Sequence, residues 1–278
     1  MKRREFLKVS LAGTLTGAGV AGISGLLAAD RQLSKIGVQL YTVRGLMQED
    51  FLGTLREVAA VGYKEFEFAG YYNRSPGEIR SILDDLGVEA PSTHVSLVAV
   101  REDLDGLIEQ ARTIGHRYLT VPSLPGGERD TLQAYSRIAK EFNQIARTCR
   151  DAGLNFAYHN HAFEFEAMDG RLPYDVLLEE TDPELVEMEV DLFWMIAGGH
   201  DPLAYFEKYP GRFSLCHVKD RTASGEMASV GRGVVDFAAI FAKSDQAGLK
   251  HYIVEHDRPE SPLDSIRASY AHLKELRF

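Results

Sequence analysis

From Lys35 onward the chain alternates short apolar runs with helix-like stretches, and this alternation limits the possible folds more than any other feature. The apolar runs read as eight buried strands, at residues 36–41, 65–68, 88–95, 118–121, 154–157, 185–188, 213–216 and 252–254. Helical patterns occupy residues 52–61, 76–86, 103–114, 130–152, 174–180, 203–209, 236–247 and 265–276. Eight strand and helix pairs predict a (β/α)8 TIM barrel.

Glycines separate five of the helical patterns from the strands that follow them. They are Gly62, Gly87, Gly115, Gly153 and Gly248. Because glycine readily adopts the left-handed conformation that ends a helix, this spacing predicts parallel βα units with right-handed crossovers and no hairpins. The main alternative is a doubly wound open sheet, but no Gly-x-Gly-x-x-Gly follows the first strand. With 45% hydrophobic residues, residues 35–278 can form one barrel domain.

The charge and the cysteines exclude several kinds of protein. The formal net charge of −10 disfavours nucleic acid as a partner, because phosphates require a basic surface. Cys149 falls in a helical pattern and Cys216 in a strand-like run. We therefore expect two buried thiols and no disulfide framework.

Residues 1–29 read as a targeting segment and not as part of the barrel. Arg3 and Arg4, followed by Phe6, Leu7 and Lys8, precede a charge-free stretch rich in glycine and alanine. This pattern resembles a twin-arginine export signal, with an ordinary N-terminal anchor as the alternative. It predicts a periplasmic or otherwise exported protein that has no membrane span after cleavage and is membrane-anchored if the segment is retained.

Polar clusters end the last four strand-like runs. They occupy residues 158–161, 189–191, 217–220 and 255–257. In a barrel the C-terminal ends of all strands meet on one face, which is where catalytic residues are placed. The four clusters therefore predict one shared metal or acid/base site.

The spacing within these clusters indicates which side chains share a face. Glu189 and Asp191 are two residues apart on a strand, as are His217 and Lys219, so each pair points to the same side. Two carboxylates there require a cation, or else an ion pair with a buried lysine or arginine. Glu255 ends another strand, where a carboxylate needs a metal or an ion-pair partner.

The stretch after the fifth strand offers further candidates. His159 and His161 lie on one face if the strand continues that far, and we expect one to bind metal and the other to orient a neighbouring group. Glu164 is a candidate acid/base, with a solvated loop carboxylate as the alternative. Trp194, the single tryptophan, is placed to form a wall against a sugar ring or to pack in the core.

Taken together, the motifs from Lys35 to the end resemble the sugar phosphate isomerase/epimerase superfamily, the xylose isomerase-like barrels. They are Tyr-His-Asn-His-x-Phe-Glu-Phe at 158–165, Glu-x-Asp-x-x-Trp at 189–194, His-x-Lys-Asp at 217–220, Val-Gly-x-Gly-x-x-Asp-Phe at 230–237 and Val-Glu-His-Asp at 254–257. Each motif is weak alone, but the combination in this order is specific.

The resemblance implies one divalent cation, manganese, cobalt, zinc or magnesium, held by residues of strands five to eight. Asp191, His217 and Glu255 match the last three ligand positions. Where sugar epimerases of the family carry a glutamate on strand five, this chain has Tyr158 and His159. An imidazole ligand from His159 would favour zinc, cobalt or manganese over magnesium.

By resemblance, we expect a metal-dependent sugar isomerase/epimerase or a dehydratase/lyase that removes the proton next to a carbonyl. Glu255 or Glu164 is the expected base and Lys219 the expected acid or oxyanion partner. The remaining residues expected to bind substrate are His161, Trp194, Arg232 and His256. An exported enzyme suggests a non-phosphorylated sugar, keto-sugar or oxidised glycoside, because sugar phosphates are scarce outside the cytoplasm. Barrels of this family often pair, so a homodimer is also expected.

Two other classes remain as alternatives. A noncatalytic sugar- or metal-binding barrel would keep the pocket and lack a working base, as the absent strand-five glutamate would allow. A repair endonuclease similar to the related endonuclease IV branch is disfavoured by the acidic charge and by too few histidines and carboxylates for a three-zinc cluster.

Overall fold

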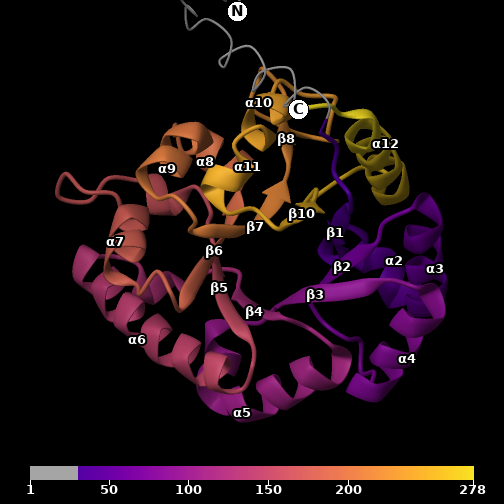
Figure 1. Cartoon of the computed structure of the whole chain (residues 1–278), viewed down its shortest axis with the longest axis horizontal. Helices are drawn as coiled ribbons and strands as arrows, with labels where there is room; N and C mark the ends of the chain where they lie inside the picture. The colour runs from indigo at the N-terminus through magenta and orange to yellow at the C-terminus, as the bar shows by residue number, and fades with distance from the viewer. Residues whose placement is uncertain (1–30) are drawn as a thin grey trace, which may run out of the picture.

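The computed structural model describes residues 31–278, so the segment predicted as an export signal, residues 1–29, lies outside the described residues. Eight parallel strands close into a barrel in the order β1-β10-β7-β6-β5-β4-β3-β2. Figure 1 shows the strands at the centre and the helices around them. The predicted (β/α)8 TIM barrel is therefore confirmed. Its strands are β1 (Gly37–Gln39), β2 (Glu65–Phe68), β3 (Glu89–His94), β4 (Tyr118–Val121), β5 (Asn155–His159), β6 (Val186–Asp191), β7 (Phe213–Val218) and β10 (His251–Val254).

The helices pack their apolar faces against the outside of the barrel. Their starts follow local signals, as where Ser75 and Glu78 form a reciprocal capping box. All five glycines predicted to end helices have positive φ angles, which confirms that reading. The helices are α2 (Arg44–Glu49), α3 (Phe51–Val61), α4 (Pro76–Leu86), α5 (Leu97–Ile114), α6 (Leu132–Asp151), α7 (Pro173–Glu180), α8 (Leu192–Ala197), α9 (Pro202–Lys208), α10 (Phe237–Phe241), α11 (Ser244–Ala247) and α12 (Pro262–Glu275).

Two predicted helices differ from those observed. The helix expected at 103–114 begins at Leu97, and Asp103 forms a kink inside it, with φ −154° and ψ 68°. The Asp103 carboxylate accepts a hydrogen bond from the Gly106 amide, so this residue caps the second half of the helix. The segment expected to be one helix at 236–247 is divided into α10 and α11.

The prediction that the chain contains no hairpin was wrong. Strands β8 (Asp220–Arg221) and β9 (Met227–Ala228) pair antiparallel just after β7. The Asp220 carboxylate accepts hydrogen bonds from the amides of Gly231, Gly233 and Val235. These bonds close the loop that follows the hairpin. Sequence periodicity gave no signal for the hairpin, because each of its strands has only two residues.

The inside of the barrel is divided into an apolar part and a polar part. Tyr118, Ala157, Leu215 and Ile253 form a small buried cluster of their own, whereas charged and imidazole side chains gather toward the C-terminal ends of the strands. Both cysteines are buried and free, as predicted. Within residues 31–278, no helix has both the length and the apolar character that a bilayer crossing demands.

Candidate active site

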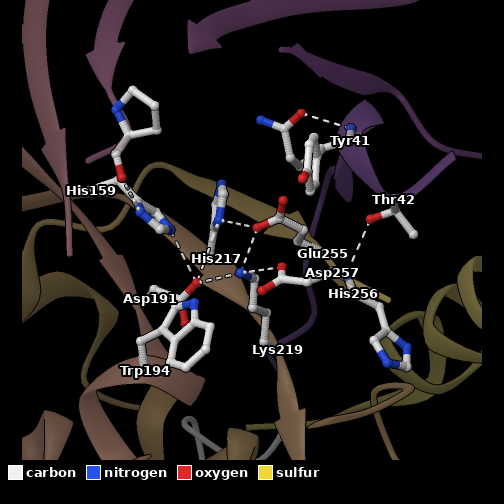
Figure 2. Close-up of polar contacts among 12 residues, drawn as sticks. Tyr41, Thr42, His159, Asp191, Trp194, His217, Lys219, Glu255, His256 and Asp257 are labelled. Carbon is white, nitrogen blue, oxygen red and sulfur yellow. Dashed lines mark hydrogen bonds and ion pairs between the residues drawn. The ribbon is translucent and has the colours of Figure 1, made fainter. Parts of the chain in front are cut away.

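Four side chains from four strand ends meet at the C-terminal end of the barrel. His159 and Asp191 are the last residues of β5 and β6, His217 lies near the end of β7, and Glu255 follows β10 directly. One potential ligand atom from each lies within 4.8 Å of the others, and all four residues are buried. These are the four residues that the sequence predicted as metal ligands, and we call them the first cluster (Figure 2).

Distances within the first cluster are close to those around a metal ion. His159 Nε2 lies 3.1 Å from Asp191 Oδ2. His217 Nδ1 lies 2.9 Å from Glu255 Oε2 and 3.7 Å from Asp191 Oδ2. Donors of a tetrahedral zinc site are about 3.4 Å apart when the metal bonds are about 2.1 Å long. Small movements would therefore bring all four atoms onto one cation.

Contacts outside the first cluster orient its inner atoms toward one another. His159 faces an acceptor with each nitrogen, the Pro122 carbonyl 3.1 Å from Nδ1 and Asp191 Oδ2 3.1 Å from Nε2. A proton on Nδ1, held by the Pro122 carbonyl, would leave Nε2 able to bind a cation. The Trp194 amide donates to Asp191 Oδ1, so Oδ2 faces the cluster, where it also contacts the Lys219 ammonium. His217 Nδ1 is buried and has no hydrogen-bond partner among the described residues. Two imidazoles and two carboxylates, oriented in this way, fit a divalent cation.

Lys219 lies between the carboxylates of the site. Its ammonium is 2.9 Å from Asp191 Oδ2, 2.6 Å from Glu255 Oε2 and 2.8 Å from Asp257 Oδ1. Figure 2 shows this ammonium at the centre of three dashed contacts. The side chain is almost fully buried, so these contacts act in a low-dielectric environment.

The charges of the site stabilise one another against burial. Burial alone would lower the pKa of Lys219, but the charges of Asp191 and Glu255 outweigh it and hold this pKa well above its usual value. Burial would raise the pKa of Asp191 and of Glu255, yet the Lys219 ammonium holds both below the usual range. Burial would likewise lower the pKa of His217, and the surrounding carboxylates raise it instead. The site is therefore a charged network and not a set of neutral groups.

A cavity of about 440 Å³ opens onto this network. His159, Lys219 and Glu255 form part of its wall. Its size suits a small molecule such as a monosaccharide. The complete lining is Tyr41, Ala69, His94, Ser96, Pro122, Ser123, His159, His161, Lys219, Glu255, Asp257 and Arg258.

Glu164 and His161 both follow β5, but only His161 lines the cavity. Glu164 is fully buried in a short 3-10 helix (Phe163–Phe165) and is not among the residues that line the cavity. Its carboxylate accepts hydrogen bonds from the Tyr158 hydroxyl and the His161 amide, and burial raises its pKa to about 7. Glu164 thus holds the His161 backbone in position, and we do not retain it as the acid/base.

His161 does line the cavity, as expected for a residue that contacts substrate. Burial, with a further contribution from the adjacent His159, lowers its pKa to about 3. The ring is therefore neutral at physiological pH, and its buried Nδ1 has no partner among the described residues. A neutral imidazole of this kind can exchange hydrogen bonds with a sugar hydroxyl.

Three other residues predicted to bind substrate lie outside the cavity wall. The centre of the Trp194 ring lies 5.8 Å from the Lys219 ammonium nitrogen, and the ring also packs near the His161 ring. His256 points away from the cluster (Figure 2), with its Nδ1 3.0 Å from Ser265 Oγ. Arg232 is exposed in the loop that Asp220 holds. Arg232 and His256 are therefore not retained as substrate contacts.

The sequence reasoning missed Glu67 of β2 and His94 of β3. Both lie against the other side of His217, and His94 also lines the cavity. A signal was present in residues 65–68, because Glu-Phe-Glu-Phe places two carboxylates on one face of a strand that is buried at every position. Asp257 was noted only as a member of its cluster, although it pairs with Lys219.

Comparisons with known proteins agree with this architecture. A family model described as "Xylose isomerase-like TIM barrel" matches residues 55–276. An inosose dehydratase from Geobacillus kaustophilus (strain HTA426) is 25% identical over 242 residues, which cover 72% of this chain and 77% of that protein. The name of this relative describes an enzyme that removes water from an inosose.

Solved structures show the same barrel. A sugar phosphate isomerase/epimerase from Parabacteroides distasonis ATCC 8503 superposes with a TM-score of 0.76 and 26% identity, over 89% of this chain and 97% of that chain. The IolI protein, solved with a bound zinc atom, superposes with a TM-score of 0.69 and 14% identity, over 85% of this chain and 95% of that one. At 14% identity, the second comparison shows the fold alone.

Proposed function

Because the chain belongs to the xylose isomerase-like TIM barrel family, we propose that it is a divalent-metal-dependent enzyme that dehydrates a keto-sugar or a related cyclic ketone. In this reaction a base removes the proton next to the carbonyl, and the hydroxyl on the next carbon then leaves as water. Isomerisation and epimerisation begin with the same proton removal. The similarity to an inosose dehydratase supports dehydration as the outcome.

One observation carries the proposal: Glu255 and Lys219 face a cavity of about 440 Å³ beside a set of four residues suited to a divalent cation. When bound, such a cation supplies Lewis acidity for the negative charge that develops on a carbonyl oxygen. Two imidazoles and two carboxylates suit zinc, cobalt or manganese. The proposal of a divalent cation rests on the imidazole nitrogens and carboxylate oxygens of the first cluster.

The distribution of acidic groups around the cavity favours chemistry with one base. The carboxylates in its lining, Glu255 and Asp257, both follow β10. The histidines line it from elsewhere, His94 from β3, His159 from the end of β5 and His161 from just beyond β5. Epimerisation with two glutamates would require a carboxylate on each face of the substrate. Elimination requires only one base and one acid near each other.

Glu255 and Lys219 can serve as that base and acid. Glu255 takes the proton next to the carbonyl, and Lys219 protonates the departing hydroxyl, so one molecule of water is released. Since Glu255 Oε2 and Lys219 Nζ are 2.6 Å apart, the proton then passes from Glu255 to Lys219 directly. Both groups return to their starting state without an additional reactant.

The test is a survey of unphosphorylated inososes and keto-sugars in D2O, followed by NMR, with and without added Mn²⁺, Co²⁺ or Zn²⁺. We expect exchange of the proton next to the carbonyl and loss of water, both abolished by a chelator and reduced at least about 100-fold in Lys219→Met. Glu65→Gln is the matched control, because Glu65 is a buried glutamate of β2 that does not line the cavity. Protein that binds metal and ketone without any proton exchange would instead establish a noncatalytic binding barrel.

We further propose that residues 1–29 direct export by the twin-arginine route and that the substrate is therefore not phosphorylated. The paired Arg3 and Arg4 support this proposal. Cell fractionation should place the wild-type protein outside the cytoplasm, and replacement of both arginines by lysine should retain it inside. An unchanged distribution in the double variant would contradict the proposal.

A further inference from the structure

A second cluster of possible ligands lies beside the first and shares one residue with it. It consists of Glu67 of β2, His94 of β3, Glu189 of β6 and His217 of β7. One potential ligand atom from each lies within 4.8 Å of the others. Glu67, Glu189 and His217 are fully buried, and His94 nearly so.

His217 faces the two clusters with different nitrogens. Its Nε2 lies 2.7 Å from Glu67 Oε2 and 3.4 Å from Glu189 Oε2. Its Nδ1 faces Glu255 and Asp191 of the first cluster. With carboxylates on both sides, the ring can donate from both nitrogens as an imidazolium. If it loses both ring protons, the resulting imidazolate has a lone pair on each nitrogen and can lie between two cations.

The carboxylates of the second cluster lack the partner that the first cluster has. Asp191 and Glu255 share the Lys219 ammonium, whereas the ion-pair contacts of Glu67 and Glu189 among the described residues are all to histidines. Gln39 Nε2 donates to Glu67 Oε2 at 2.7 Å. Glu67 Oε1 and Glu189 Oε1 are buried and accept no hydrogen bond within residues 31–278. Each such oxygen costs about 1–3 kcal/mol unless a ligand satisfies it.

The spacing of the four groups fits a cation closely. His94 Nε2 lies 3.3 Å from Glu67 Oε2, and His217 Nε2 lies 3.4 Å from Glu189 Oε2. These two separations match the roughly 3.4 Å expected between donors around tetrahedral zinc. The other two, from His94 to Glu189 and from His217 to Glu67, are both 2.7 Å. They would open by roughly 0.7 Å as metal bonds replace hydrogen bonds.

We propose that Glu67, His94, Glu189 and His217 form a second divalent cation site, joined to the first through His217, whose ring releases its protons to solvent and offers one nitrogen to each cation. Two imidazoles and two carboxylates suit Zn²⁺, Co²⁺ or Mn²⁺. His94 lines the cavity, so a cation held by this cluster reaches the site from the substrate side. The second site does not depend on which reaction the protein catalyses.

The test is a titration of chelator-treated full-length protein with Co²⁺, followed by equilibrium dialysis for stoichiometry and by visible absorption for coordination. We expect two equivalents in the wild type and one in Glu67→Gln and in His94→Asn, with the first site still filled. Asp191→Asn should also bind one, through the second cluster. Glu65→Gln, which changes a buried glutamate on the same strand bonded to His251, should keep two.

A second measurement separates loss of a site from loss of the fold. On heating, metal-free Glu67→Gln should still unfold in one cooperative transition, since the amide keeps the shape of the side chain and an acceptor for Gln39 Nε2. A wild type that binds one equivalent, kept in Glu67→Gln and lost in Asp191→Asn, overturns the second site and leaves the proposed enzyme intact. A single equivalent lost in Glu67→Gln and kept in Asp191→Asn supports the second site and removes the first.

Discussion

Strands β2 and β10 each place polar side chains in two regions of the barrel interior, and the two regions differ in how their charges are balanced. In one, Glu65 of β2 bonds to His251 of β10 at 2.9 Å. In the other, Glu67 of β2 and Glu255 beyond β10 belong to the two clusters around His217. The two regions are close along the chain, since Glu67 follows Glu65 by two residues and Glu255 follows His251 by four.

The two regions differ in how many carboxylates each contains relative to the histidine and lysine side chains that can pair with them. Glu65 and His251 form a closed pair of one carboxylate and one imidazole, beside the Tyr118 ring. At the other end, four buried carboxylates share one lysine and three histidines, and two carboxylate oxygens have no donor among the described residues. A balanced buried pair can be purely structural, whereas a surplus of acceptors indicates a place for a cation.

The largest expected effect comes from removing one ligand of the first cluster. Asp191→Asn should lower turnover at least about 1000-fold, equivalent to about 4 kcal/mol, because it removes a metal ligand and a partner of Lys219 together. Steady-state kinetics on the keto-sugar that exchanges fastest would measure this. Glu65→Gln should stay within about twofold of wild type, and a similar loss in both variants would remove the distinction between the two regions.

Removing Lys219, the lysine that pairs with carboxylates of the first cluster, should affect stability as well as catalysis. Lys219→Met leaves Asp191 and Glu255 buried without their ammonium, which costs about 3–5 kcal/mol in the metal-free protein. Added Mn²⁺ or Zn²⁺ should restore part of that loss, since a cation takes over the pairing. Urea unfolding with and without metal tests this, and a metal-free variant as stable as wild type would show that the lysine is not needed for charge balance.

Glu164 sharpens the comparison because it is a buried carboxylate whose hydrogen bonds come from a hydroxyl and an amide. Its pKa is about 7 in the folded chain, raised by burial from an ordinary 4.5. Between these values the folded chain keeps a proton that the unfolded chain has lost, so stability falls as pH rises from 4.5 to 7, by about 3 kcal/mol. Glu164→Gln cannot titrate.

The free energy of unfolding of Glu164→Gln should therefore depend less on pH across this window than that of wild type. Denaturant unfolding at pH 4.5, 5.5, 6.5 and 7.5 would measure the two slopes. Parallel slopes would mean that Glu164 is ionised in the folded protein throughout.

The smallest of these effects should come from removing the carboxylate of the pair formed by Glu65 and His251. Glu65→Leu leaves the His251 imidazole without its acceptor and should destabilise the fold by about 1–3 kcal/mol, with turnover per folded molecule unchanged within about twofold. Thermal unfolding and active-site-normalised kinetics measure the two quantities. A loss of turnover larger than the loss of folded protein would show that the two ends of the barrel are coupled.

Local patterns were sufficient to predict much of this protein. Period-two alternation in 189–191 and 217–219 placed Asp191, His217 and Lys219 inside the barrel, and the helix-ending glycines indicated parallel units. The kink at Asp103 was not predicted, because an N-cap inside a helix has the same sequence signal as a helix start. Glu164 was expected in a loop and instead lies in a short 3-10 helix. Its burial depends on Tyr158 and on packing that no local pattern reports.

The sequence by itself determined the barrel class and the side of each strand on which the polar groups of β5, β6, β7 and β10 lie, because both follow from the periodicity of short segments. Only the tertiary structure decided that Glu67 and His94 meet His217 from across the barrel, at a sequence separation of 150 residues for the Glu67 and His217 pair. It also decided that His217 divides its nitrogens between two clusters. Barrel closure and strand register set these contacts, and both are properties of the whole chain.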